Sequence, residues 1–415
     1  MDVTSTPIPT DLLTPLGAYL RLRAGANASF LLESVEQGRL GRHSFIGSGS
    51  RLVTFEEAES LDEPVVGYLA YDHVAKLEPT VPLPADGAGL PESRFVVAET
   101  LVRFDHGSGT AEVLAGNPDA IATRLETEIV LQEHKLSAGT EVRRYPDQST
   151  YEDGVRRIKE LIRAGDAFQV VLSQRAERTT SASAVELYRA LRRVNPSPYL
   201  FLLELEELAL IGSSPETLVK CENGTASLNP IAGTTEPGDG DAERLLASEK
   251  DRAEHVMLVD LGRNDLSRVC EAGSVKVARY LEPERFSHVT HLVSEVTGEL
   301  RDGVTPFDLL RACFPAGTVS GAPKVRAMQI VSELEGYRRG TYAGAVGYVL
   351  PGGPGSSPTM DTCIAIRAIA LSDGVARLQA GAGIVADSDP AAEHQECLNK
   401  LAALEAAIDL AEKGS

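Results

Sequence analysis

Apolar residues in the first third of the chain gather in short runs that turn-forming residues separate. The runs 65–71 and 95–104 are rich in the aromatic and branched side chains that favour β-strands. The stretch 133–148 is polar and rich in charge, which is typical of a linker. We therefore expect two units: an N-terminal unit over residues 1–145 and a second unit over residues 146–415.

Helical and strand-like periods alternate in the second unit. Residues 155–162 carry apolar positions at helical spacing, and the apolar run 168–172 follows. Thr305 precedes a proline and has N-cap chemistry, which predicts a helix start, and Asp389 begins the last predicted helix in a similar way.

Two dipeptides mark tight hairpins. Asn223-Gly224 lies between two strand-like runs, and Asp373-Gly374 follows the apolar run 362–371. Hairpins that alternate with helices predict antiparallel sheets with helices packed on them.

Length and charge narrow the class of protein. The chain has 415 residues, more than the roughly 250 to 300 at which a single core stops growing, so more than one packed unit is expected. Its 43% of hydrophobic and 24% of charged residues exclude global disorder. With 40 basic and 60 acidic residues the net charge is -20, which argues against nucleic acid or an anionic membrane as the main partner. An anionic substrate would then need a cation or a local basic pocket.

The five cysteines lie far apart and form no C-x-x-C pair, so neither a disulfide framework nor a thiolate zinc site is predicted. The N-terminal residues lack the basic and apolar regions of a secretory signal, and no stretch approaches the roughly 20 apolar residues of a membrane span. These features predict a cytoplasmic protein with no membrane partner. Neither a Gly-x-Ser-x-Gly elbow nor a Walker A loop is present, which disfavours covalent hydrolases and nucleotide kinases.

Two acidic pairs on predicted helices share one spacing. Asp251 and Glu254 lie three residues apart, as do Glu393 and Glu396, so each pair occupies one helix face. Two such faces brought together would offer the hard oxygen ligands that suit Mg2+. Acidic residues are also common near helix N-termini, where the helix dipole favours them, and that alternative stays open.

The segment Gly381-Ala382-Gly383 follows a predicted strand and begins a match to the dinucleotide-binding pattern G-x-G-x-x-A. Too little chain follows it for the βαβ unit and the ribose-binding acid that this pattern requires. Two interpretations are left. Either the glycines let backbone N–H groups approach an anion closely, or they form a tight turn with positive φ.

Three polar residues occur in apolar, strand-like runs. His291 is there either as a satisfied core residue or as a catalyst. Gln169 needs hydrogen-bond partners if its strand is buried. Arg367 needs an anion, which is either a ligand or a carboxylate of the protein.

Beyond residue 150 the chain carries a series of strings in order: FQVVLSQR, NPSPYLF, GSSPE, LNPIAGT, AEHVMLVDLGRNDLSRV, HLVSEV, FPAGTVSGAPKVRAM, YAGAVGY, MDTCIAIR, QAGAGIVADSDP and a closing E-x-x-E-x-x-N-K. FLLESVEQG, SFIG, VGYLAYD and LVRFDH precede them in a shorter than usual N-terminal unit. From residue 151 to 407, the chain resembles the chorismate-utilising enzymes, most closely the large, synthase subunits of anthranilate synthases.

The resemblance implies an α+β fold in which large antiparallel β-sheets pack as a sandwich with helices on the outside. It also implies a Mg2+-dependent lyase. Such an enzyme aminates chorismate at C2 with ammonia and then eliminates pyruvate to give anthranilate, for tryptophan biosynthesis or a secondary-metabolite pathway.

By the same resemblance, Glu216 would act as general acid toward the departing C4 hydroxyl, and His291 would assist the loss of pyruvate. The Mg2+ ligands would be Glu254 and Glu396, with Asp251 and Glu393 as further or alternate ligands. The substrate carboxylates and enolpyruvyl group would bind Gly233, Thr234, Thr318, Tyr342, Arg367, Gly381, Ala382 and Gly383.

Two positions distinguish members of this family. Isochorismate and salicylate synthases place a lysine base where this chain has Gln169, and a glutamine cannot deprotonate water, so we expect ammonia as the nucleophile. Aminodeoxychorismate synthases place a nucleophilic lysine where this chain has Ala232. Amination at C2 is therefore expected, with Gln169 in the catalytic site.

The resemblance also implies partners and regulation. No cysteine lies in the Gly-x-Cys-x-Gly setting of a glutamine amidotransferase, so a separate amidotransferase subunit would supply ammonia in a hetero-oligomer. The family's tryptophan-regulatory residues fall at Ser34, Pro198, Tyr199 and Leu200, with Leu200 in place of the usual methionine. Leu40 stands where a tryptophan is typical, and we expect weakened feedback.

Two other interpretations stay open. A relative that stops at 2-amino-2-deoxyisochorismate would retain the enolpyruvyl group, and His291 argues against it. A non-catalytic regulatory paralogue would be expected to lose Glu216, Glu254 or Glu396, and all three are present.

Overall fold

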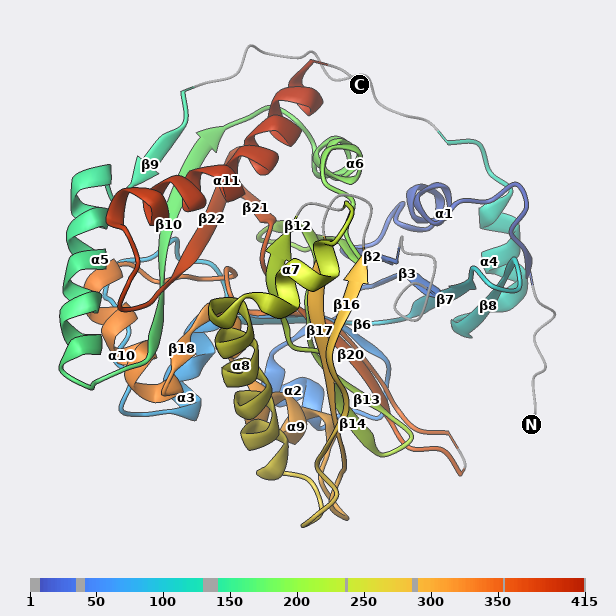
Figure 1. Cartoon of the computed structure of the whole chain (residues 1–415). Helices are drawn as coiled ribbons and strands as arrows, with labels where there is room; N and C mark the ends of the chain where they lie inside the picture. Colours follow the sequence, from blue (N-terminus) through green and yellow to red (C-terminus); the bar gives the residue numbers. More distant parts are fainter. Residues whose placement is uncertain are drawn as a thin grey trace.

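Two large antiparallel β-sheets form the centre of the computed structural model, which describes residues 8–34, 42–129, 141–235, 238–285, 290–353 and 355–413 (Figure 1). Twelve described strands make the first sheet, in the order β1 (Ile8–Pro9), β8 (Thr110–Ala115), β7 (Thr100–Asp105), β3 (His43–Gly49), β2 (Ala28–Glu33), β11 (Tyr199–Glu204), β12 (Ala209–Ser214), β21 (Ala368–Ser372), β22 (Val375–Ile384), β10 (Gln169–Thr179) and β18 (Gly321–Ala322), with β9 (Arg143–Tyr145) beside β10.

The second sheet has ten described strands. Their order is β15 (Ile231–Thr235), β17 (Thr290–Glu299), β14 (Thr225–Leu228), β13 (Thr217–Glu222), β20 (Thr359–Ile364), β19 (Ala345–Leu350), β5 (Val65–Leu69), β6 (Ser93–Val97) and β4 (Leu52–Val53), with β16 (Lys276–Arg285) beside β17.

Helices cover the outer face of each sheet. The described helices are α1 (Pro15–Leu22), α2 (Phe55–Glu59), α3 (Val74–Leu77), α4 (Pro118–Leu125), α5 (Gln148–Arg163), α6 (Ala184–Val194), α7 (Asp241–Ala247), α8 (Glu249–Ser267), α9 (Pro306–Cys313), α10 (Lys324–Glu335) and α11 (Pro390–Glu412), with short 3-10 turns η1 (Tyr71–His73) and η2 (Gly317–Val319). Helices α1, α6 and α11 contact the first sheet, and α8 and α9 contact the second. No helix in the described ranges is both long and apolar enough to cross a membrane.

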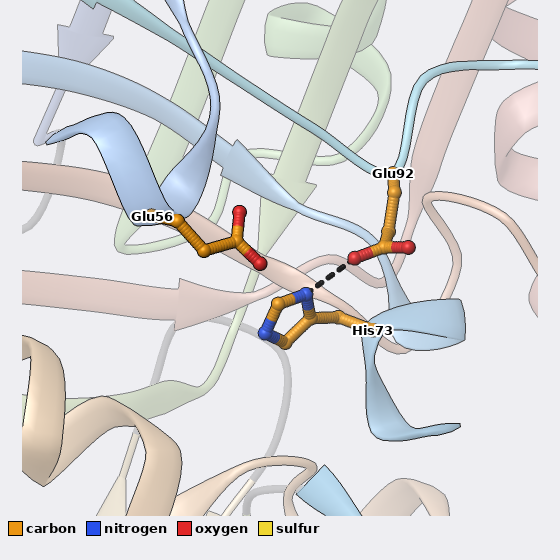
Figure 2. Close-up of side chains that lie close together, drawn as sticks. All are labelled: Glu56, His73 and Glu92. Atoms are coloured by element: carbon orange, nitrogen blue, oxygen red, sulfur yellow. Dashed lines mark hydrogen bonds and ion pairs between the residues drawn. The ribbon is translucent and has the colours of Figure 1, made fainter. Parts of the chain in front are cut away.

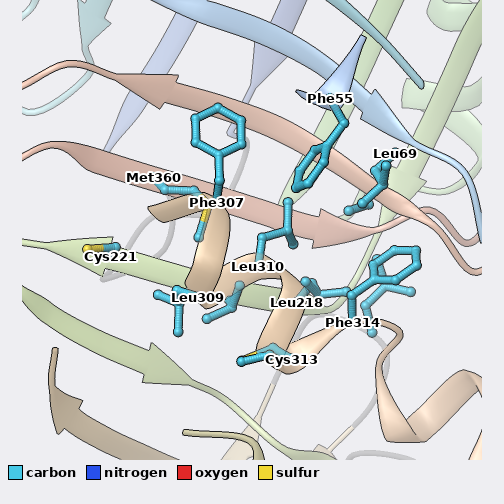
Figure 3. Close-up of a cluster of buried hydrophobic side chains, with 14 of the residues drawn as sticks. Phe55, Leu69, Leu218, Cys221, Phe307, Leu309, Leu310, Cys313, Phe314 and Met360 are labelled. Carbon is cyan, nitrogen blue, oxygen red and sulfur yellow. The ribbon is translucent and has the colours of Figure 1, made fainter. Parts of the chain in front are cut away.

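Buried apolar side chains join these layers. Phe30 and Phe201 of the first sheet pack with Tyr68 and Val346 of the second, so one cluster lies between the sheets. A further cluster lies beneath α1, α6 and α11. A third lies between the second sheet and α9, where Leu309 and its neighbours face Leu218 and Met360 (Figure 3). This order of helix, sheet, sheet and helix confirms the predicted α+β sandwich.

Local turn and cap chemistry accounts for several elements as predicted. Asn223 and Gly224 take φ values of 52° and 79° and connect the antiparallel strands β13 and β14. Thr305 caps α9 through a reciprocal pair of hydrogen bonds with Asp308, at 3.1 and 3.0 Å. The apolar period over 155–162 falls in α5, as expected.

Two runs that the sequence suggests as single strands are pairs of strands in different sheets. Residues 95–104 contain the end of β6, in the second sheet, and most of β7, in the first. Residues 362–371 are divided in the same way between β20 and β21. Each crossing carries one charged residue, Glu99 in the first run and Arg367 in the second, but the strands on either side are mostly apolar, so the hydrophobic pattern does not show the change of sheet.

Both sheets contain strands from either side of residue 145. The first joins β2 to β11, and the second joins β5 to β19. Within the predicted linker, β9 pairs with β10, while residues 133–140 lie outside the described residues. The boundary near residue 145 stays a prediction.

Truncation of one buried leucine tests this packing. Leu309 is fully buried in the α9 cluster, so Leu309→Ala should lower the free energy of unfolding by about 2 to 5 kcal/mol, because it leaves a cavity. Leu12 is fully exposed, and Leu12→Ala should change it by less than about 0.5 kcal/mol. Urea unfolding measures both, and equal effects would contradict the assigned core.

Candidate active site

The chain crosses between the two sheets at two neighbouring points, and each crossing carries a candidate site residue. Glu216 lies between β12 of the first sheet and β13 of the second. Arg367 lies between β20 of the second sheet and β21 of the first. The Ser213 N–H donates to the Arg367 carbonyl at 3.1 Å, and the Ile364 N–H donates to the Glu216 carbonyl at 3.0 Å. These bonds hold the two crossings together.

The Glu216 carboxyl is mostly buried, and its protonation is shifted. Burial raises its pKa to about 7, while the Thr318 hydroxyl and the charges of Lys400 and Arg367 offset part of the rise. A carboxyl with this pKa still holds a proton near neutral pH, as a general acid must. Thr318 lies in η2, and its buried Oγ1 is close enough to the Glu216 carboxyl to lower that pKa, although the two make no hydrogen bond of normal geometry.

Arg367 takes the left-handed backbone conformation, with a φ of 50°. Burial lowers the pKa of its guanidinium, and the nearby Glu216 charge raises it. Within the described part of the chain, the guanidinium makes no ion pair or side-chain hydrogen bond. Of the two alternatives that the sequence leaves for this cation, the arrangement therefore favours a ligand anion.

Gly381 and Gly383 lie inside β22, and neither has a positive φ, so the tight-turn interpretation is wrong. Their role is to leave space. A Cβ on Gly381 would come within 2.7 Å of the Tyr342 hydroxyl, and a Cβ on Gly383 within 2.5 Å of Gln169 Nε2. Tyr342 is buried, and Ala382 between the glycines is fully buried.

Gln169 connects β10 to α8. Its side chain is buried, and its Nε2 donates to Glu254 Oε1 at 3.2 Å. A buried glutamine needs a hydrogen-bond partner, and for Gln169 that partner is Glu254, one of the predicted metal ligands.

His291 and Asp251 both lie close to Gly233. The Nδ1–H of His291 donates to the Gly233 carbonyl at 3.0 Å, and burial lowers the pKa of this histidine. Gly233 has a φ of 73°, and a Cβ there would lie 3.1 Å from Asp251 Cβ. In the ladder, His291 is the partner of Thr234.

The sequence gives no role to Lys400, although it closes the last motif. Its Nζ pairs with Glu396 Oε1 at 2.7 Å and donates to the Gly381 carbonyl at 2.8 Å. Its charge also acts on Glu216. Lys400 lies four residues after Glu396 on one helix, and this spacing is the sequence signal that predicts their ion pair.

The four predicted metal ligands offer only carboxylate oxygens. Mg2+ is commonly held by one or two carboxylates, with water and substrate oxygens completing its shell, so the donor set fits this ion. In the described residues, no three ligand atoms of Asp251, Glu254, Glu393 and Glu396 lie within 4.8 Å of one another.

A different group does meet that distance: Glu56, His73 and Glu92 (Figure 2). Its two carboxylates bind Lys76 Nζ at 2.9 and 2.8 Å, and Glu92 also accepts a hydrogen bond from His73 Nδ1. Lys76 thus already pairs with both carboxylates of this group and offsets one of their two charges, and the group contains none of the predicted ligands.

The residues predicted to bind tryptophan line a cavity of about 390 Å3 between the sheets. Ser34, Pro198, Tyr199 and Leu200 all contribute to it, and Ser34 Oγ donates to the Pro198 carbonyl at 3.0 Å. Leu40 lies outside the described residues. The fold therefore brings the two segments predicted to be regulatory to one cavity.

The family model of chorismate binding enzymes matches residues 14–406, and this chain belongs to that family. It is 44% identical to a probable anthranilate synthase component 1 from Schizosaccharomyces pombe, with 98% of this chain and 92% of the relative covered. It is 42% identical to the anthranilate synthase component 1 of Thermus thermophilus, with 97% of each covered.

A solved structure agrees with the fold. The crystal structure of anthranilate synthase component I from Streptococcus pneumoniae TIGR4 matches with a TM-score of 0.79 at 33% identity, over 96% of this chain and 98% of that one. Family membership confirms the resemblance seen in the sequence, whereas the role of each site residue stays a prediction.

The raised pKa of Glu216 makes stability depend on pH. Between its ordinary pKa of about 4.5 and about 7, the folded protein binds more protons than the unfolded chain, so this residue lowers stability as pH rises. Glu216→Gln should therefore gain about 2 kcal/mol relative to the native protein between pH 5 and pH 8. Urea unfolding at both pH values measures this gain. Glu222→Gln, at an exposed site on β13, is the control, and a pH-independent difference for Glu216→Gln would refute the assignment.

Proposed function

We propose that this chain is a lyase that converts chorismate and ammonia into anthranilate and pyruvate, for tryptophan biosynthesis or a secondary-metabolite pathway. The observation that carries the proposal is the pair of linked sheet crossings. They set Glu216, with its raised pKa, beside Arg367, which has no ionic partner among the described residues. The relatives at 44% and 42% identity bear the name anthranilate synthase component 1.

Substrate binding uses the groups that the protein leaves unsatisfied. The planar guanidinium of Arg367 fits a carboxylate through two parallel hydrogen bonds, and the Thr318 hydroxyl supplies a further donor. The space beside Gly381 and Gly383 lets the substrate approach the backbone of β22. The remaining proposed contacts are Gly233, Thr234, Tyr342 and Ala382.

Two side chains move protons. Glu216 donates to the C4 hydroxyl as this group leaves and ammonia adds at C2. With the Nδ1–H of His291 donated to Gly233, Nε2 is its basic atom, and it takes the C2 proton as pyruvate is lost. Burial lowers the pKa of His291, which keeps the ring neutral and able to accept.

Glu254 and Glu396 would hold Mg2+, with Asp251 and Glu393 as further or alternate ligands. When bound, the ion neutralises a substrate carboxylate and so lowers the cost of bringing that charge into the site. Gln169, hydrogen-bonded to Glu254, carries no basic group that deprotonates water, which supports ammonia as the nucleophile.

Ammonia would come from a separate glutamine amidotransferase subunit in a hetero-oligomer. The designation of the relatives as component 1 supports a second component. The five cysteines of this chain are free and buried, which suits a reducing compartment such as the cytoplasm.

The products of a single incubation test the proposal. The purified chain with chorismate, Mg2+ and ammonium at alkaline pH should release anthranilate and pyruvate in equal amounts, detected by fluorescence and mass. Removal of Mg2+ with a chelator should abolish this release. An amino-enolpyruvyl adduct without pyruvate would instead indicate a 2-amino-2-deoxyisochorismate synthase, and unchanged chorismate would indicate a non-catalytic paralogue.

We also propose that the cavity between the sheets binds tryptophan only weakly. Leu200 takes the place of a methionine in its wall, which changes the side chain that a ligand contacts. Ammonium-dependent activity should be equal with and without excess tryptophan. Inhibition at micromolar tryptophan would contradict this.

A further inference from the structure

Arg339 is a buried cation that the reaction described above does not use. Its side chain is 1% exposed and pairs with Glu335, which is 6% exposed, at 2.7 Å. Glu335 also accepts hydrogen bonds from the Ser173 N–H at 2.9 Å and the Ser173 hydroxyl at 2.6 Å. The pair therefore connects the end of α10 with β10.

The guanidinium of Arg339 also donates hydrogen bonds to two backbone carbonyls that lie next to proposed site residues. Nη1 donates to Val319 O at 2.6 Å, and Nη2 donates to Val171 O at 2.7 Å. Val319 directly follows Thr318. Val171 is the ladder partner of Gly383. One planar group thus fixes the distance between η2 and the strand that carries Gln169.

The face of the same guanidinium packs on aromatic rings. It lies 5.5 Å from the centre of the Tyr342 ring and 4.7 Å from that of Tyr71. Tyr342 is the residue whose hydroxyl occupies the space beside Gly381. Arg339 therefore supports a third segment of the site from behind.

Stability alone is a weak reason for such a pair. Replacing a buried ion pair by neutral groups of similar size is often neutral or stabilising, because the charges cost solvation energy to bury. A rigid fork with five donors does, however, fix several acceptors in one geometry, which a lysine cannot do.

We propose that Arg339, held by Glu335, is a positioning residue for the chorismate-binding part of the site. It acts through Thr318, Tyr342 and the β22 glycines and touches no reacting atom. The inference rests on the proposed function, since it names the residue that sets the geometry of that binding site.

Comparing the KM for chorismate with the KM for ammonium distinguishes a positioning role of Arg339 from a role in folding alone. The double variant Glu335→Gln/Arg339→Gln removes both charges together, so no unpaired charge is left buried. We expect its chorismate KM to rise about tenfold or more, with the ammonium KM within about twofold of the native value. Arg339→Lys keeps the charge but loses the fork, and should raise the chorismate KM by an intermediate factor.

Arg338→Gln is the matched control. Arg338 is the preceding, exposed arginine and donates to the Pro84 carbonyl at 2.8 Å, so its loss should leave both KM values unchanged. A merely structural role for Arg339 would reduce the fraction of active protein, which lowers kcat and leaves both KM values unchanged. That result, or a native chorismate KM in the folded double variant, overturns the proposal.

Equilibrium dialysis of chorismate with the same proteins makes the test independent of turnover. If the native chain binds chorismate but forms no anthranilate, the proposed function fails, while a weaker Kd for the double variant still supports the positioning role. An unchanged Kd overturns that role.

Discussion

The passage of two neighbouring strand pairs from one sheet to the other is the constraint on which the site depends. In the first sheet β12 pairs with β21, and in the second sheet their continuations β13 and β20 pair with each other. The segments β12–β13 and β20–β21 therefore pass from one sheet to the other side by side. Glu216 lies in the first of these crossings, and Arg367 lies in the second. Backbone N–H and C=O groups at a crossing have left one sheet and need other hydrogen-bond partners. Here the carbonyls of Glu216 and Arg367 accept hydrogen bonds from the neighbouring segment.

This arrangement explains the electrostatics of the site. An acid at a crossing lies within the sandwich, so burial disfavours its charge and raises the pKa of Glu216. A guanidinium there cannot lose its charge and makes no ion pair within the described part of the chain. In the proposed mode of binding, a dianionic substrate would supply the missing negative charge and so offset the cost of burying the guanidinium.

Sequence patterns predicted those features that are decided within a few residues. The Asn223-Gly224 turn and the Thr305 cap are examples, because their chemistry is local. The sheet changes at 98–99 and 365–367 could not be predicted, since the flanking strands are mostly apolar and one charged residue, Glu99 or Arg367, does not by itself indicate a change of sheet. The reason for Gly381 and Gly383 was equally hidden, because the atoms that require their small size belong to Tyr342 and Gln169, which are distant in the chain.

The members of the two acidic pairs have different physical explanations. The helix dipole explains an acid in the first turn of a helix, whereas the proposed metal site would explain an acid further along the same face. Asp251 lies in the first turn of α8, where its N–H is bonded by the Ser248 cap, and the helix dipole favours an acid there. Glu254 lies one turn further on, beyond the range of that effect, as does Glu396 in α11. Glu254 accepts a hydrogen bond from Gln169, and Glu396 pairs with Lys400. The helix-end effect thus accounts for Asp251 but not for Glu254 or Glu396, and these two are the residues proposed to hold the metal.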